Sequence, residues 1–147
     1  MTDYLVYPEI AGGFGDNAEL DTTSTPPTVT RLHYEIETWM GGELLRTYPV
    51  YVATDRFVEM VTANGLTGFA TDTAEVTVSE QGREFMIEKG KSTDIPHFQW
   101  FKVVGTRGRD DFSTVAGRDL VVSQRALDVI RPLLGPDHDI ERTDQPR

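Results

Sequence analysis

Two arginines and two aspartates lie close together and form the strongest candidate for a reactive site. Arg107, Arg109, Asp110 and Asp111 fall within five residues of one another. When two carboxyl groups lie beside cations, their pKa values can differ from each other. One group can then act as an acid and the other as a base at neutral pH. The same residue types more often form surface ion pairs, each worth roughly 0–1 kcal/mol. This segment is therefore kept as an alternative site, for a small enzyme or a ligand-binding domain.

A second candidate is the pattern His33-x-Glu35-x-Glu37, which would place three possible metal ligands on one face of a strand. Neighbouring members of such a pattern lie about 7 Å apart, which is too far for tight tetrahedral coordination by these three side chains alone. The other histidines, His97 and His138, do not lie at metal-ligand spacing from His33 or from each other. A solvated strand face explains the pattern better, so we expect neither a metal nor a cofactor.

The sequence lacks the motifs of nucleophilic catalysis and of phosphate binding. It contains no cysteine, which excludes thiolate nucleophiles, disulfides and cysteine-ligated metals. The glycines at positions 12, 13 and 15 are not followed by the Lys-Ser/Thr ending of a phosphate loop. No serine lies in a Gly-x-Ser-x-Gly elbow. We therefore predict a binding protein and not an enzyme, with no catalytic residues.

The charge balance narrows the class of partner. The chain has 24 acidic and 14 basic residues, which gives a net charge of −10. Such a surface repels nucleic acids and anionic membranes and attracts basic proteins. The aromatic run from Phe98 to Phe101 could stack nucleic-acid bases, but stacking proteins combine aromatic side chains with a basic groove. We expect a protein partner, no nucleic acid and no membrane. The absence of a leader-like N-terminus and of long apolar runs predicts a cytoplasmic protein.

The segment that carries the histidine and glutamate pattern alternates between apolar and polar residues. Val29 to Trp39 therefore reads as a half-solvated antiparallel strand. Leu32, Tyr34 and Ile36 are expected on its inner face, and Arg31, His33, Glu35 and Glu37 on its outer face. Gly41-Gly42 predicts a hairpin turn that leads into a broken strand over Glu43–Val52.

The rest of the 147-residue chain is predicted to form short strands and few helices. The other expected strands are Tyr4–Tyr7, Ala74–Ser79 with Glu84–Glu88 as a hairpin, His97–Val104, Leu120–Val122 and Asp139–Glu141. Apolar residues on both faces of His97–Val104 predict that this strand is central.

Two short helices complete the expected elements. One is capped by Thr54 or Asp55 and runs to about Ala63, and the other follows Ser123 and is ended or kinked near Pro132. The predicted fold is a single α+β domain over residues 1–147 with a mainly antiparallel sheet and two short helices. It includes an irregular loop over residues 11–28 and a polar C-terminal tail.

About the last third of the chain resembles a known family. The matching stretches are residues 97–105, with a tryptophan-bearing strand, residues 110–112, and the Leu-Val-Val-Ser-x-Arg-Ala-Leu step within residues 119–130. This pattern resembles bacterial immunity proteins of polymorphic toxin systems, in a group first described only as a domain of unknown function. The resemblance implies a protein that binds and neutralises a cognate toxin. Because many such toxins attack nucleic acids or nucleotides with basic clefts, an acidic inhibitor suits them.

The matching positions are core and capping residues, so the interface is expected in the unmatched first hundred residues. The predicted partner-binding residues are Phe14, Asp16, Glu19, Asp21, Glu35, Glu37 and Trp39. Phe14 and Trp39 are the expected anchors, since aromatic side chains carry much of the energy of protein interfaces. The identity of the toxin and the oligomeric state stay open.

Overall fold

The aromatic strand lies inside a four-stranded antiparallel sheet, as its two apolar faces predict. The computed structural model describes residues 2–143. In it, β10 (Phe98–Val103) lies between β7 (Val50–Thr54) and β8 (Phe69–Asp72), and β6 (Leu44–Thr47) pairs with the other edge of β7. Successive side chains of β10 point to opposite faces. Each face of this sheet therefore packs on a different hydrophobic cluster.

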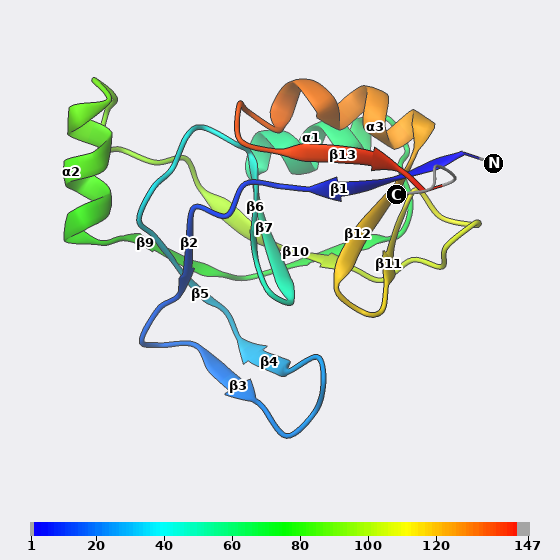
Figure 1. Ribbon diagram of the computed structural model, residues 1–147, viewed down its shortest axis with the longest axis horizontal. Coiled ribbons are helices and arrows are strands. Elements are labelled where there is room, and N and C mark those ends of the chain that lie inside the picture. The colour runs from blue at the N-terminus through cyan, green and yellow to red at the C-terminus, as the bar shows by residue number, and fades with distance from the viewer. Residues whose placement is uncertain (1, 144–147) are drawn as a thin grey trace.

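The first cluster is aromatic at its centre. Phe101 of β10 lies edge-on to Phe57 and Phe112, with ring centroids 5.4 Å and 5.3 Å apart. The helices α1 (Asp55–Ala63) and α3 (Gln124–Ile130) close this cluster and contact each other (Figure 1). Edge-to-face aromatic pairs add stabilisation beyond the area that they bury. Phe101 is fully buried and is one of the residues that fix this layer.

A second four-stranded antiparallel sheet covers the other side of the first cluster. Its strand order is β11 (Phe112–Val115), β12 (Asp119–Ser123), β1 (Asp3–Tyr7) and β13 (Asp139–Arg142). The strands predicted at Tyr4–Tyr7, Leu120–Val122 and Asp139–Glu141 are confirmed. β11 follows directly on the charged segment that holds the alternative site, and it brings that segment against the start of α3.

A three-stranded sheet forms the second cluster together with the opposite face of β10. β5 (His33–Ile36) pairs antiparallel with β2 (Gly12–Phe14) and parallel with β9 (Glu75–Val78). Tyr34 is fully buried in this cluster beside Phe98. Its hydroxyl accepts a hydrogen bond from a backbone N–H and donates one to a backbone carbonyl, so the buried polar atom is satisfied.

The segment predicted as an irregular loop contains regular structure, so that prediction is wrong. Besides β2, it holds β3 (Glu19–Asp21), which pairs with β4 (Thr28–Arg31) as a hairpin. Figure 1 shows this β3–β4 hairpin projecting away from the rest of the molecule. The glycines of this segment were read as loop residues, which was misleading. A Cβ on Gly12 would lie 1.9 Å from the carbonyl oxygen of Glu35. Gly12 thus permits a close approach between strands and does not mark a turn.

The single alternating strand predicted over Val29–Trp39 is two strands, separated at Leu32. β5 also has a parallel neighbour, which the antiparallel prediction missed. His33, expected to face solvent, is buried. Its Nδ1 accepts a hydrogen bond from the backbone N–H of Asn17 at 3.1 Å, and its Nε2 lies 2.7 Å from Thr77 Oγ1. Both ring nitrogens have partners, which makes a buried histidine tolerable.

The expected Gly41-Gly42 hairpin does not form, because β6 pairs with β7 and not with β5. The turn instead lies between β6 and β7 and contains Pro49. Proline suits a tight turn, because its missing N–H costs no ladder hydrogen bond there.

The second half of the predicted 74–88 hairpin is a helix, so that prediction is also wrong. α2 (Glu80–Glu88) follows β9, and the Ser79 hydroxyl caps it by accepting a hydrogen bond from the backbone N–H of Gly82 at 3.0 Å. The buried residues of α2 are Gly82 and Met86, four positions apart, which is helical spacing. The short apolar run in this segment fits a strand or a helix equally well. Residues 2–143 therefore contain three α-helices and not two.

The two predicted helices are confirmed with their caps. Thr54 Oγ1 accepts from the backbone N–H of Phe57, and Ser123 Oγ accepts from that of Ala126, both at 3.1 Å. α3 ends at Ile130, and Pro132 lies in a short 3₁₀ turn that follows. No helix in residues 2–143 is long and apolar enough to cross a membrane.

Gly82 provides a test of how α2 is docked. Alanine in place of glycine normally stabilises a helix interior by about 1 kcal/mol. In this structure a Cβ at position 82 would lie 2.4 Å from the Ile36 carbonyl oxygen. Gly82→Ala is therefore expected to destabilise the protein by about 1–3 kcal/mol, measured by urea unfolding. A variant more stable than the wild type would show that α2 does not pack on β5 in this way.

Candidate functional site

An acidic groove runs between α2 and the chain that leaves β5. α2 stands at one end of the molecule, apart from the packed pair α1 and α3 (Figure 1). The groove has a volume of about 250 Å³. Its lining consists of Glu37, Thr38, Gln81, Glu84, Phe85 and Glu88. We call these six residues the acidic groove.

The carboxylates of the acidic groove lack cation partners. Within residues 2–143, neither Glu37, Glu84 nor Glu88 has a lysine, arginine or histidine nitrogen within 4 Å of its carboxylate. One cation, Lys89, lies on this side of the helix with its Nζ 5.6 Å from the centroid of the Phe85 ring. The groove therefore presents several acceptors to solvent around a half-buried aromatic ring.

The acidic residues of α2 lie close together and lower the stability of the helix. Glu80, Glu84 and Glu88 recur every four residues and so lie along one face. Like charges at this spacing disfavour a helix, and a carboxylate in the last turn is also opposed by the helix dipole. These acids therefore give α2 a concentrated negative face that its helical structure does not require.

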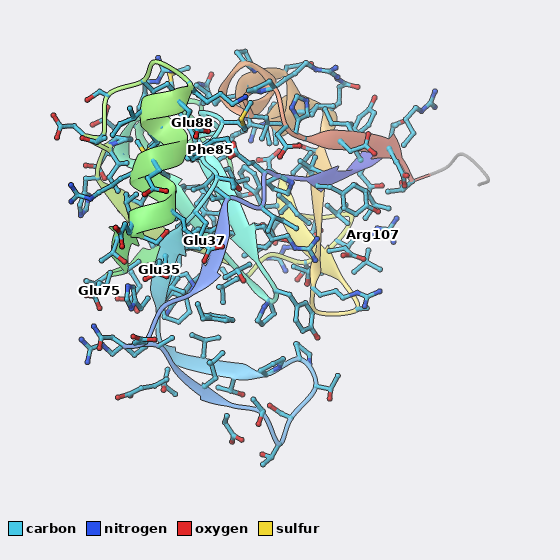
Figure 2. The ribbon with its side chains drawn as sticks, turned by 60° about the vertical axis from the view of Figure 1, so that its left-hand side comes forward. Glu35, Glu37, Glu75, Phe85, Glu88 and Arg107 are labelled. Atoms are coloured by element: carbon cyan, nitrogen blue, oxygen red, sulfur yellow. The ribbon has the colours of Figure 1, made fainter. Side chains whose placement is uncertain are left out.

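The groove continues towards the predicted acids of β5. Figure 2 shows Glu35, Glu37, Phe85 and Glu88 on the same side of the molecule, with Arg107 on the opposite side. Glu37 is exposed and Glu35 is half-buried. Of the two glutamates predicted from the Val29–Trp39 segment, Glu37 thus lines the groove beside a helix whose acids were missed, and Glu35 of β5 lies on the same side. The four-residue spacing of glutamates in α2 was the signal that could have revealed them.

A buried carboxylate holds the loop that carries Glu37. Glu9 is 1% exposed, and it accepts hydrogen bonds from the backbone N–H groups of Met40 at 2.6 Å and Gly42 at 2.9 Å. Burial raises the pKa of the Glu9 carboxyl, although these two hydrogen bonds oppose the rise. The Trp39 indole also donates to the Gly42 carbonyl at 2.9 Å. These contacts therefore hold the chain that forms one wall of the groove in place.

The two expected aromatic anchors already have partners within the protein. Phe14 and Trp39 are half-buried and pack against the second cluster. The Trp39 ring lies edge-on to Phe98 at a centroid distance of 6.1 Å. Both side chains therefore support the fold directly, and Phe85 is the aromatic ring that lines the acidic groove.

The other acids predicted for the interface lie on or beside the β3–β4 hairpin. Asp16, Glu19 and Asp21 are all exposed. The Asp21 carboxylate accepts hydrogen bonds from the Thr23 hydroxyl and, at 2.9 Å, from the Thr23 backbone N–H. These hydrogen bonds lower the pKa of Asp21. The structure places these acids away from the acidic groove, on a projecting element (Figure 1).

In the alternative site, Asp111 belongs to a network that holds the fold together. Its carboxylate accepts hydrogen bonds from Arg125 Nη2 at 2.7 Å, Ser123 Oγ at 2.6 Å and the Thr67 backbone N–H at 2.9 Å. Burial by itself raises the pKa of Asp111, but these donors outweigh it and lower the pKa to about 2. Asp111 is thus a firmly ionised acceptor that ties β11 to the start of α3.

The other members of that site bind elsewhere. Arg107 Nε donates to Asp3 at 3.2 Å, and the Asp110 carboxylate accepts from the Thr106 backbone N–H at 2.8 Å. Arg109 is exposed. Arg107, Asp110 and Asp111 thus have separate partners, and the four predicted residues do not converge on one site.

No cation site accompanies these groups. Over the part of the chain that the structure describes, no three His, Asp or Glu side chains gather around a common metal position. Comparison of the chain with protein-family models, with curated proteins and with solved structures found no match. The geometry of the acidic groove therefore carries the functional argument.

Proposed function

We propose that this chain is an immunity protein that binds a basic toxin protein through the acidic groove and blocks the cleft with which the toxin acts. The observation that carries the proposal is the set of exposed carboxylates around Phe85 that have no cation partner among residues 2–143. A partner with lysine and arginine side chains would supply those missing partners. The resemblance of the last third of the chain to immunity proteins supports the same reading.

The distribution of charge suits fast capture of such a partner. A protein of net charge −10 attracts a basic protein over long distances, and a concentrated acidic face orients the encounter. Speed matters for an immunity protein, since every unbound toxin molecule can act on the cell. Toxins that cleave nucleic acids or nucleotides have positively charged clefts, which an acidic face can bind.

Apolar contacts would supply affinity that charge alone does not. Phe85 is half-buried and lines the groove. An aromatic ring surrounded by polar groups is a common centre of binding energy in protein interfaces. The Arg107–Asp111 segment offers no comparable arrangement, and we do not propose an enzymatic function for it.

Co-expression tests the proposal in cells. The toxin candidate is the product of the gene adjacent to this one, and the protein is expected to act in the cytoplasm, where that product would reach its target. Expression of the candidate alone should stop growth, and co-expression with this chain should restore it. Continued growth arrest, with both proteins present at comparable levels, would contradict the proposed function.

A further inference from the structure

The outer edge of β4 in the β3–β4 hairpin is open. β4 leads through Leu32 into β5, and β9 pairs with β5 only from His33 onward. The Glu75 backbone N–H donates to the Leu32 carbonyl at 3.0 Å, and the chain before Glu75 turns away towards β8. Within residues 2–143, β4 therefore has β3 on one side and no strand on the other. Alternate N–H and C=O groups of such a strand point outward.

A groove lies beside that open edge. Its volume is about 350 Å³, and it is bounded by residues 30–32 on the β4 side and by residues 72–75 on the other. Trp100, 9% exposed, contributes an apolar surface, and Ala74 is half-buried. An open strand edge next to a side-chain pocket is the combination on which recognition by strand addition depends. The backbone supplies the hydrogen bonds, and the pocket selects side chains.

We propose that an extended, basic segment of the toxin adds as a strand to the open edge of β4 and places a side chain in this groove. This inference rests on the proposed function and adds a second contact to it. The hairpin carries Glu19 and Asp21 on exposed positions. Glu75 lies at the rim, where its carboxylate accepts hydrogen bonds from the Asn17 side-chain amide at 3.0 Å and 3.3 Å and lies 3.9 Å from Arg31 Nη2. A lysine or arginine of the added strand would compete for that carboxylate.

Charge also favours a basic segment of the toxin over a second copy of the chain as the strand that adds to β4. Two copies would each bring a net charge of −10, and their acidic hairpins would meet as like charges. A basic segment would meet Glu19 and Asp21 of the hairpin and Glu75 at the rim of the groove, and it would have to lie beside one base, Arg31 of β4. The β3–β4 hairpin is a two-stranded element that forms no sheet with the rest of the described chain. Isolated two-stranded hairpins are marginally stable in water, so an added third strand would stabilise it.

Amide hydrogen exchange with and without the adjacent gene product tests strand addition directly. In the complex, exchange of the amides in β4 is expected to slow by about tenfold or more. Ala74→Arg would fill the groove and should weaken binding by about tenfold. Ala70→Arg, on exposed β8 outside the groove, is the matched control and should bind within about twofold of wild type. Thermal melts of both variants establish that they are folded.

The outcomes separate the two proposals. Protection of α2 with unchanged exchange in β4 would overturn strand addition and leave the immunity function standing. Equal binding by the Ala74→Arg and Ala70→Arg variants would overturn it as well. Protection of β4 that appears without the toxin and grows with protein concentration would identify a second copy as the occupant and overturn the proposal. If no complex forms, the immunity function fails, and strand addition fails with it.

Discussion

Replacing Asp111 with alanine is expected to lower the free energy of unfolding by about 3 kcal/mol, because the substitution leaves several donors around a buried site without their acceptor. Those donors are Arg125, Ser123 and the Thr67 backbone N–H. Asp110→Ala is the matched control, since it removes the same group one residue away. Asp110 accepts one backbone hydrogen bond at the surface, so its loss should cost no more than about 1 kcal/mol. Urea unfolding of the two variants measures the difference, and equal losses would contradict the assignment.

The same carboxylate predicts a pH dependence. The folded-state pKa of Asp111 is about 2, below the ordinary value of 3.8. A carboxyl whose pKa is lowered by folding stabilises the protein above the unfolded pKa, and this contribution is lost as the pH falls through the folded pKa. The wild type should therefore lose stability between about pH 4 and pH 2. Asp111→Asn should show a flatter slope in that window, and an unchanged slope would mean that another group is responsible.

Reversing two charges in the acidic groove is expected to weaken toxin binding by about 100-fold, mainly through a slower association rate. The variant is Glu84→Lys with Glu88→Lys, and it places cations where the basic partner would lie. Stability should not fall, because a lysine at position 84 attracts Glu80 and a lysine at position 88, in the last turn, suits the helix dipole. Stopped-flow mixing at low and high salt measures the effect, and the difference from wild type should shrink at high salt.

A matched double variant controls for net charge. Glu59→Lys with Asp128→Lys changes two exposed residues on α1 and α3. Both double variants replace two negative charges by two positive charges, so each moves the net charge from −10 by the same amount. The control variant should lose only the small part of the association rate that depends on overall charge. Equal losses in the two variants would show that overall charge matters and the acidic groove does not.

Local signals with a single physical meaning predicted the fold well. Thr54 and Ser123 each precede an apolar stripe at helical spacing, and both cap helices as expected. The run from His97 to Val104 is apolar on both faces, which only a strand with two covered faces accommodates, and β10 is central. These patterns needed no knowledge of distant contacts.

The failures share a cause, which is that the deciding contact lies far away in the sequence. Gly12 looks like a loop residue, yet its small size serves a close approach to Glu35 across strands. Gly82 looks like a turn, yet it lets α2 pack on the Ile36 carbonyl. Neither neighbour can be identified from spacing along the chain.

The candidate site was predicted only in part, again because distant contacts decide it. Alternation in β5 pointed to Glu35 and Glu37, and both lie on the acidic side of the molecule (Figure 2). Glu84, Phe85 and Glu88 were missed because their segment was read as a strand, which hid the common face of the glutamates in α2. The Asp110-Asp111 pair looked reactive because the partner of Asp111 is Arg125, fourteen residues further along the chain.

Titration calorimetry of the purified wild-type protein with the adjacent gene product tests the central claim most directly. The account predicts a one-to-one complex with a dissociation constant of about 10 nM at moderate salt, weakening steadily as salt is added. The acidic-groove reversal should bind about 100-fold more weakly under the same conditions. The absence of any heat of binding at concentrations of about 100 μM, with both proteins shown to be folded, would contradict the account. A tight complex that the groove reversal leaves unchanged would contradict the role given to α2.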